Sequence, residues 1–120
     1  KCSGGFVFGG YADVPWSSHG GYIPSPKAFL FSLHGPSGLG PVKLPLVRNH
    51  QFAMRCNGSF GPTFGGGYDL HVADNANAGN SYSALGFSYR LPSGQSASTF
   101  FTGAREFKAA EVEVYQVPLQ

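Results

Sequence analysis

The sequence predicts an all-β domain, an antiparallel two-sheet β-sandwich with minor helix. Three observations favour this fold: 18 glycines and 9 prolines among 120 residues, an aromatic content of 15%, and few continuous runs of strong helix formers. Short apolar stretches separated by turns recur along the chain, as is typical of antiparallel sheets. The length suits one domain spanning residues 1–120, and we find no internal repeat and no linker.

Eight segments have the apolar content or the two-residue alternation of strands. In order they lie within residues 4–11, 28–33, 42–47, 51–56, 68–73, 85–91, 99–102 and 110–117. The first is a short apolar stretch bracketed by glycines, and the second is the continuous apolar run of a buried strand. The third contains Pro45, which has no N–H for a ladder hydrogen bond, so we expect an edge strand or an extended connection.

Two of the later segments place their apolar side chains on one face. These side chains are Phe52, Met54 and Cys56 in residues 51–56, and Val112 and Val114 in residues 110–117. The stretches 14–22 and 34–41 are rich in Gly, Pro and Ser, and we expect both to be loops.

Residues 68–73 combine a strand pattern with groups that could bind a ligand. Leu70 and Val72 are expected to face the core, which directs Asp69 and His71 outward. The strand therefore predicts two polar side chains on the protein surface.

An Asn-rich segment, residues 74–80, follows this strand. Asn and Gly favour turns with a left-handed backbone, so a plain hairpin loop explains the segment. Oxygens from Asp74, Asn75 and Asn77 would also suit calcium, although alanines at the third and fifth positions depart from the EF-hand pattern. A turn, a calcium site and a sugar site all stay open, and apart from calcium we expect no cofactor.

Sugar recognition needs fixed polar groups for the hydroxyls and an aromatic ring for the apolar face of the sugar. We expect hydroxyl recognition by the polar side chains of residues 69–77, with Trp16 or Tyr82 against the sugar ring. The candidate sugar-binding residues are Trp16, His19, Asp69, His71, Asp74, Asn75, Asn77 and Tyr82.

The sequence gives no support for an enzyme. The G-x-S-x-G pattern of serine hydrolases is absent, and the four histidines lack a short metal-binding spacing. Glu111 and Glu113 share a strand face, but paired carboxylates on an exposed face are usually solvated charges. We expect no catalytic residues.

Cys2 and Cys56 are the only two cysteines, and such a pair is compatible with one disulfide or with two unrelated thiols. A bridge closing a loop of this length would contribute on the order of 4 kcal/mol. Asn57-Gly58-Ser59 matches the N-glycosylation pattern, which implies a surface loop in a secreted protein. Together the two features predict a disulfide, glycosylation at Asn57 and an extracellular location.

The charge pattern argues against nucleic acid as a partner. Only 12% of the residues are charged, the formal net charge is +2, and the lysines and arginines are scattered. No apolar run approaches the roughly 20 residues of a membrane span, so membrane insertion is not expected.

Several motifs, in the right order over nearly the whole chain, carry a resemblance to the TLDc domain family. They are Phe8-Gly9-Gly10-Tyr11, Val14-Pro15-Trp16-Ser17-Ser18, residues 28–33, Gly61-Pro62-Thr63-Phe64-Gly65-Gly66-Gly67-Tyr68-Asp69-Leu70 and Glu111-Val112-Glu113-Val114-Tyr115. The resemblance implies a two-sheet antiparallel β-sandwich. The familiar intracellular members are associated with oxidative-stress resistance and with binding the vacuolar proton pump, and they have no established catalytic residues. Their domains carry a further segment before the Phe-Gly-Gly region.

Short versions of this sequence type look like secreted proteins of marine invertebrates, among which galactose-binding lectins are common. By that analogy we expect an extracellular, galactose-type carbohydrate-binding protein that binds glycans and forms a homo-oligomer. The alternative is an intracellular TLDc-type interaction protein linked to oxidative-stress resistance or to the vacuolar proton pump.

Overall fold

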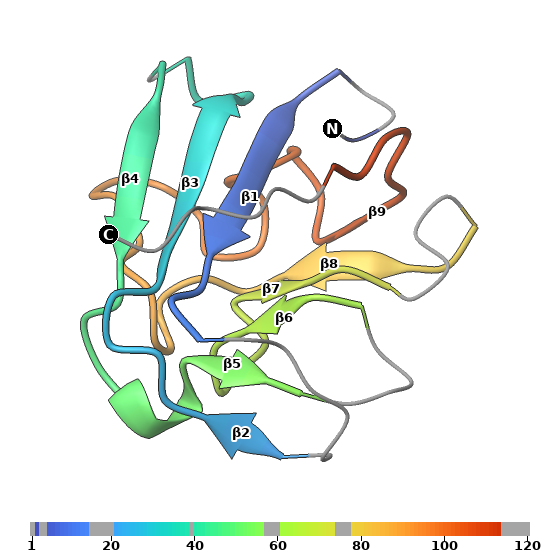
Figure 1. Cartoon of the computed structure of the whole chain (residues 1–120). Coiled ribbons are helices and arrows are strands. Elements are labelled where there is room, and N and C mark those ends of the chain that lie inside the picture. The colour runs from blue at the N-terminus through green and yellow to red at the C-terminus, as the bar shows by residue number, and fades with distance from the viewer. Residues whose placement is uncertain are drawn as a thin grey trace.

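The computed structural model describes residues 2, 5–14, 21–38, 40–56, 61–73 and 78–113. Two antiparallel sheets make up the fold, and the one helical element among these residues is a short 3₁₀ turn, η1 (His50–Phe52) (Figure 1). The expected all-β sandwich is confirmed. Within the same residues no helix is long and apolar enough to span a membrane.

The smaller sheet has three strands in the order β1-β3-β4. They are β1 (Val7–Tyr11), β3 (Phe29–His34) and β4 (Val42–Pro45). Leu30 pairs with Gly10 on one side and with Leu44 on the other, and this row faces the core. Pro45 lies at the end of the edge strand β4, where a missing N–H is tolerated, as the sequence predicted.

The larger sheet has six short strands in the order β2-β5-β6-β7-β8-β9. They are β2 (Tyr22–Ile23), β5 (Met54–Arg55), β6 (Thr63–Phe64), β7 (Leu70–His71), β8 (Ser81–Ser83) and β9 (Glu106–Phe107). Every neighbouring pair is antiparallel. Apart from β2, the strands are ordered in space as they are in the chain, so each pairs with its neighbour in sequence.

One line of paired residues runs across all six strands of the larger sheet. In strand order, the residues of this outer-face row are Tyr22, Arg55, Thr63, His71, Tyr82 and Glu106. The adjacent line consists of Ile23, Met54, Phe64, Leu70 and Ser83. Because successive residues of a strand point to opposite faces, the second line faces the core and the first faces away from it.

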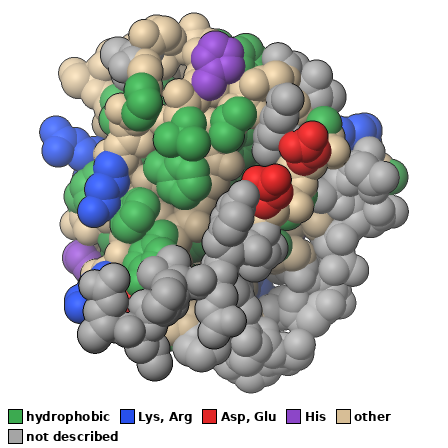
Figure 2. Space-filling view, turned by 45° about the horizontal axis from the view of Figure 1, so that its top comes forward, with side chains coloured by type: hydrophobic (Ala, Val, Ile, Leu, Met, Phe, Trp, Pro, Cys, Tyr) green, Lys and Arg blue, Asp and Glu red, His purple; other side chains and the backbone are tan. Residues whose placement is uncertain are grey.

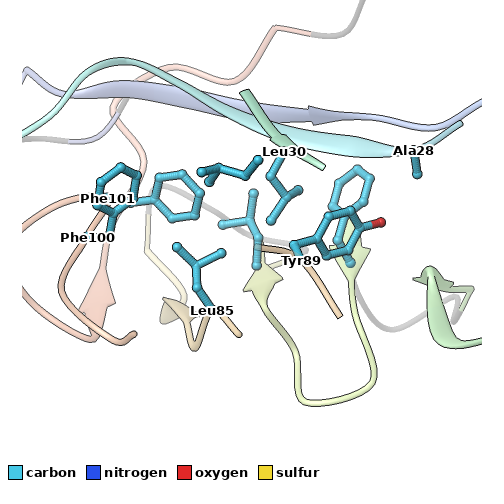
Figure 3. Packing of buried hydrophobic residues seen from close by; sticks show 9 residues of the cluster. Ala28, Leu30, Leu85, Tyr89, Phe100 and Phe101 are labelled. Atoms are coloured by element: carbon cyan, nitrogen blue, oxygen red, sulfur yellow. The ribbon is translucent and has the colours of Figure 1, made fainter. Parts of the chain in front are cut away.

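The hydrophobic core lies between the two sheets. Its buried members are Ala28, Leu30, Leu44, Phe64, Leu70, Leu85, Tyr89, Phe100 and Phe101. Figure 3 shows Leu30 pointing from β3 toward Leu85 and Tyr89, which come from the segment after β8. The core therefore combines inward-facing strand residues with side chains from turns.

Gly10 in the Phe-Gly-Gly-Tyr motif allows β1 to pass directly over this core. A Cβ atom at position 10 would lie 2.6 Å from Cζ of Phe64 and 2.8 Å from Cδ2 of Leu30. Only glycine leaves room for those two side chains. The motif is thus explained by close packing.

Several expected strands are wrong in position. Residues 85–91 and 99–102 are turns and extended chain, with a single bridge between Tyr89 and Leu46. The strand β8 (81–83) lies instead where the sequence predicted the end of an exposed loop, because its buried serines give no hydrophobic pattern. Of the predicted strand at 110–117, the described residues 110–113 are not in a strand.

The expected disulfide is also wrong, because Cys2 and Cys56 are both free, buried cysteines. Cys2 forms a bridge with Ala109, just after β9, whereas Cys56 directly follows β5. Four strand spacings of about 4.8 Å separate β5 from β9, about 19 Å in all, whereas a disulfide requires Cα atoms within about 7 Å. The order of the strands keeps the two thiols apart.

Candidate functional site

Aromatic rings and guanidinium groups cluster on the outward side of the six-stranded sheet. We call this cluster the aromatic–cation face. Its members are Tyr22, Arg55, Tyr68, His71, Tyr82 and Arg105. Four of them belong to the outer-face row, while Tyr68 precedes β7 and Arg105 precedes β9. Segments far apart in the sequence therefore supply one surface.

Three rings form the centre of this face. The ring centroids of His71 and Tyr82 are 4.9 Å apart, and those of Tyr68 lie 5.7 Å from His71 and 6.1 Å from Tyr82. Nδ1 of His71 is hydrogen-bonded to Oγ1 of Thr63 at 2.8 Å, which fixes the orientation of the imidazole. His71 is only 8% exposed, so the prediction that it is a surface side chain is wrong; its ring packs against the two tyrosine rings.

The two arginines lie over the tyrosine rings. Cζ of Arg55 is 4.9 Å from the centroid of Tyr22 and 6.0 Å from that of Tyr68. Cζ of Arg105 is 4.6 Å from the centroid of Tyr82. Such cation–π contacts hold a guanidinium against a ring. The Arg105 side chain is exposed, so its N–H groups can meet a ligand, whereas Arg55 is half-buried and its Nε is buried.

Tyr68 occupies a backbone conformation that is uncommon for a residue with a side chain, with φ of 57°. It ends a turn in which its N–H donates to the carbonyl of Gly65 at 3.1 Å. Non-glycine residues in this region cost about 1 to 2 kcal/mol, and they concentrate at functional sites. The turn places the Tyr68 ring beside His71 and Tyr82.

Asp69 holds this turn in place from the core side. Its Oδ2 accepts hydrogen bonds from the backbone N–H groups of Ser88 and Tyr89, each at 3.0 Å, and its side chain is fully buried. Burial raises the pKa of this carboxyl, although the backbone hydrogen bonds act in the opposite direction. The prediction that Asp69 faces outward and bonds a sugar hydroxyl is therefore wrong.

Burial also sets the protonation of the ring cluster. Desolvation lowers the pKa of His71 from its ordinary value of 6.5, and it raises the pKa of Tyr68 and of Tyr82 above 10.0. At neutral pH the imidazole is thus uncharged and both phenols keep their protons. The tyrosine rings are therefore uncharged, with apolar faces and hydroxyl groups that can donate hydrogen bonds.

The structure brings together two of the predicted sugar-binding residues, His71 and Tyr82. It places Asp69 on the core side of the same sheet. The remaining candidates and the predicted glycosylation site lie outside the described residues; they are Trp16, His19, Asp74, Asn75, Asn77 and Asn57. The calcium-binding prediction for Asp74, Asn75 and Asn77 thus stays a prediction.

Sequence reasoning missed Tyr22, Arg55, Tyr68 and Arg105. Tyr22 falls in the loop that the sequence predicts at residues 14–22, and the alternation in residues 51–56 predicts only that Arg55 faces outward. The available signal was that alternation: a strand with Met54 and Cys56 inward must present Arg55 outward. Which residues lie beside Arg55 depends on strand pairing, which alternation alone does not give.

A second surface, over the three-stranded sheet, is apolar. Figure 2 shows hydrophobic side chains gathered there, and Leu33 at the end of β3 is 51% exposed. Tyr11 stacks on Phe29 with centroids 5.2 Å apart, and Nζ of Lys43 lies 4.3 Å from the Phe29 centroid.

Other sites of potential chemistry are sparse in the described part of the chain. There, no three His, Cys, Asp or Glu side chains are grouped as metal ligands would be. Glu111 and Glu113, considered as paired carboxylates, are both exposed. An open groove beside β4 is lined by Val42, Lys43, Leu44, Arg90, Pro92 and Ser93.

Comparison with known proteins identifies the family. The model of the TLDc domain matches residues 2–118 of the 120. No curated protein and no solved structure matches the chain. The match includes the Phe-Gly-Gly-Tyr motif, both sheets and the turn that carries Tyr68, so the resemblance seen in the sequence is confirmed. The chain belongs to the TLDc domain family.

Proposed function

We propose that this protein is a carbohydrate-binding protein without enzymatic activity, and that its glycan-binding site is the aromatic–cation face. The observation that carries the proposal is the outer-face row, which combines three aromatic rings with three hydrogen-bonding side chains across the six strands. Galactose-containing glycans are the ligands that we expect.

The chemistry of the face suits a sugar. The partly exposed rings of Tyr68 and Tyr82 offer apolar surface to the C–H face of a pyranose, as aromatic rings in lectins do. Arg105 and Glu106 lie at the β9 end, where both side chains are exposed and can bond hydroxyl groups. The sugar ring would thus rest on tyrosine and be oriented by charged neighbours.

Location and assembly are part of the proposal. We expect an extracellular protein that gains avidity as a homo-oligomer, because single sugar sites bind weakly. The free thiols of Cys2 and Cys56 remove the disulfide from the support for secretion, which now rests on the glycosylation pattern at Asn57. The interaction role of intracellular TLDc proteins is the alternative, and it would suit the apolar surface around Leu33.

A glycan array tests the proposal, followed by titration of the best ligand with Tyr82→Ala. Loss of one aromatic platform corresponds to about 1.4 kcal/mol, so we expect about a tenfold weaker Kd. Tyr11→Ala is the matched control, since Tyr11 is also a half-buried tyrosine but lies on the outer side of the other sheet. We expect that variant to bind like the unmodified protein.

Absence of binding above background on the array, with and without calcium, would contradict the proposal. Equal losses for the two tyrosine variants would place the glycan elsewhere. In the first case, the interaction role through the surface around Leu33 would become the leading explanation.

A further inference from the structure

We infer that the glycan bound at the aromatic–cation face is an acidic oligosaccharide, which carries carboxylate or sulfate groups along its length. The inference rests on the proposed function and adds the class of ligand. It follows from the charges on the face and from their spacing.

The charges on the face are predominantly positive. Arg55 and Arg105 lie over its tyrosine rings. Lys108 follows Phe107, whose ring packs edge-on against Phe8 in the core, so alternation turns the lysine toward the outer side. Among the residues of the outer-face row and of the aromatic–cation face, Glu106 is the one carboxylate. Three cations thus accompany one anion.

Two further carboxylates, those of Asp13 and Asp69, are engaged by hydrogen bonds of their own. Asp13 accepts hydrogen bonds from the Ser25 hydroxyl and from the backbone N–H of Lys27. Asp69 is buried under the sheet, where it accepts from two backbone N–H groups. Neither carboxylate is therefore a member of the aromatic–cation face.

The arginines suit oxyanions in particular. A guanidinium presents a planar fork of N–H donors that matches the two oxygens of a carboxylate or sulfate. The Arg105 side chain is exposed while its guanidinium rests on the Tyr82 ring. The Tyr82 ring, which can pack against the sugar, therefore lies next to the Arg105 guanidinium, which can bind the acidic substituent of that sugar.

The spacing of the two arginines indicates an oligosaccharide. Arg55 is on β5, and Arg105 lies over a residue of β8, three strands away in the sheet. Three strand spacings correspond to about 14 Å, which is wider than one sugar ring. An acidic chain lying across the strands would meet both arginines, with Tyr68 and Tyr82 between them.

The Lys108 ammonium group adds to the positive end of the face. Nζ of Lys108 donates to the carbonyl of Ala78 at 2.6 Å and to Oδ1 of Asn80 at 3.2 Å, which holds the side chain beside the start of β8. A third cation thus lies at the same end as Arg105, where an acidic chain would end.

Binding to three hexasaccharides of similar length tests the inference: a neutral galactan, a galacturonan and a sulfated galactan. We expect the two acidic chains to bind on the order of tenfold more tightly than the neutral one, as charge-assisted hydrogen bonds would give. Comparison of the two acidic chains tells carboxylate from sulfate. The affinity should rise from disaccharide to hexasaccharide, because only the longer chain reaches both arginines.

Arg105→Gln and Lys43→Gln form a matched pair, since each removes one exposed positive charge and they lie on opposite sheets. We expect Arg105→Gln to weaken binding of the acidic chains about tenfold and binding of the neutral chain by only about threefold, because glutamine can still bond a hydroxyl group but forms no charge-assisted pair. Lys43→Gln should change neither affinity by more than about twofold. Unfolding curves of both variants confirm that the fold is kept.

Three results would overturn the inference. Equal affinity for neutral and acidic chains would refute the preference for acidic glycans, while the proposal that the protein binds glycans would still stand. Equal losses for the two charge variants would show attraction by net charge and not by this face. No binding of any of the three chains would remove both the inference and the proposed function.

Discussion

At the scale of single residues, the turn between β6 and β7 depends on Gly65. Its φ is +87°, a backbone conformation that residues other than glycine rarely adopt. A Cβ atom at this position would lie 2.0 Å from Oδ1 of Asp69. The buried carboxylate and the glycine are therefore one structural unit. Together they determine where the neighbouring Tyr68 ring is presented.

Gly65→Ala should lower the free energy of unfolding by about 3 kcal/mol, which combines the backbone strain with the clash against Asp69. Gly94→Ala is the control, because Gly94 has a similar φ of +79° but open space around the added atom. There we expect only the strain, about 1 kcal/mol. Denaturant unfolding of both variants measures the difference, and equal losses would show that contact with Asp69 is unimportant.

At the scale of secondary-structure elements, the six strands are short, yet their pairing extends one row across the whole larger sheet. Strands of two or three residues give little pattern in a sequence. Their arrangement comes from pairing with neighbours and from the apolar row beneath. In the middle of the row, His71 is supported by Thr63 on β6 and by the rings of Tyr68 and Tyr82.

Because burial lowers the pKa of His71 in the folded state, the unfolded chain binds a proton more readily below about pH 6.5. The stabilisation from the neutral imidazole is complete above that pH, and it is lost as the pH falls through the interval down to the folded-state pKa. We expect His71→Gln to remove this part of the pH dependence. Unfolding free energies at several pH values between 4 and 8 check it, and equal slopes for the two proteins would contradict it.

At the scale of the whole molecule, two sheets enclose a single core, and the order of strands decides which distant residues meet. Cys2 is joined to the β9 end of the larger sheet, while Cys56 lies at β5. The fold is therefore held by packing between the sheets and not by a covalent link. The same order spreads Arg55 and Arg105 across one surface.

The separation of the cysteines predicts that reducing agent leaves the Tm unchanged. The unfolded protein should release two thiols per chain in a quantitative thiol assay, and its intact mass should show no loss of two hydrogens. A drop of several degrees in Tm on reduction would show that the disulfide is present after all, since such a bridge contributes on the order of 4 kcal/mol.

The sequence by itself determined the all-β class, the strands β1 and β3, and the edge position of the Pro45 segment. These features depend on local properties: turn residues, apolar runs and the missing N–H of proline. The TLDc motifs are likewise short stretches of sequence that can be recognised without the structure. The inward direction of Met54 and Leu70 followed from alternation, as their complete burial confirms.

The tertiary structure alone decided that Asp69 is buried, that Cys2 and Cys56 stay apart, and that residues from five segments form the aromatic–cation face. Asp69 lies next to β7, where alternation gave no correct direction, and the backbone N–H groups of Ser88 and Tyr89 compensate its burial. These outcomes depend on pairing between distant strands. Such pairing is fixed by how the whole core packs, and no short stretch of sequence contains it.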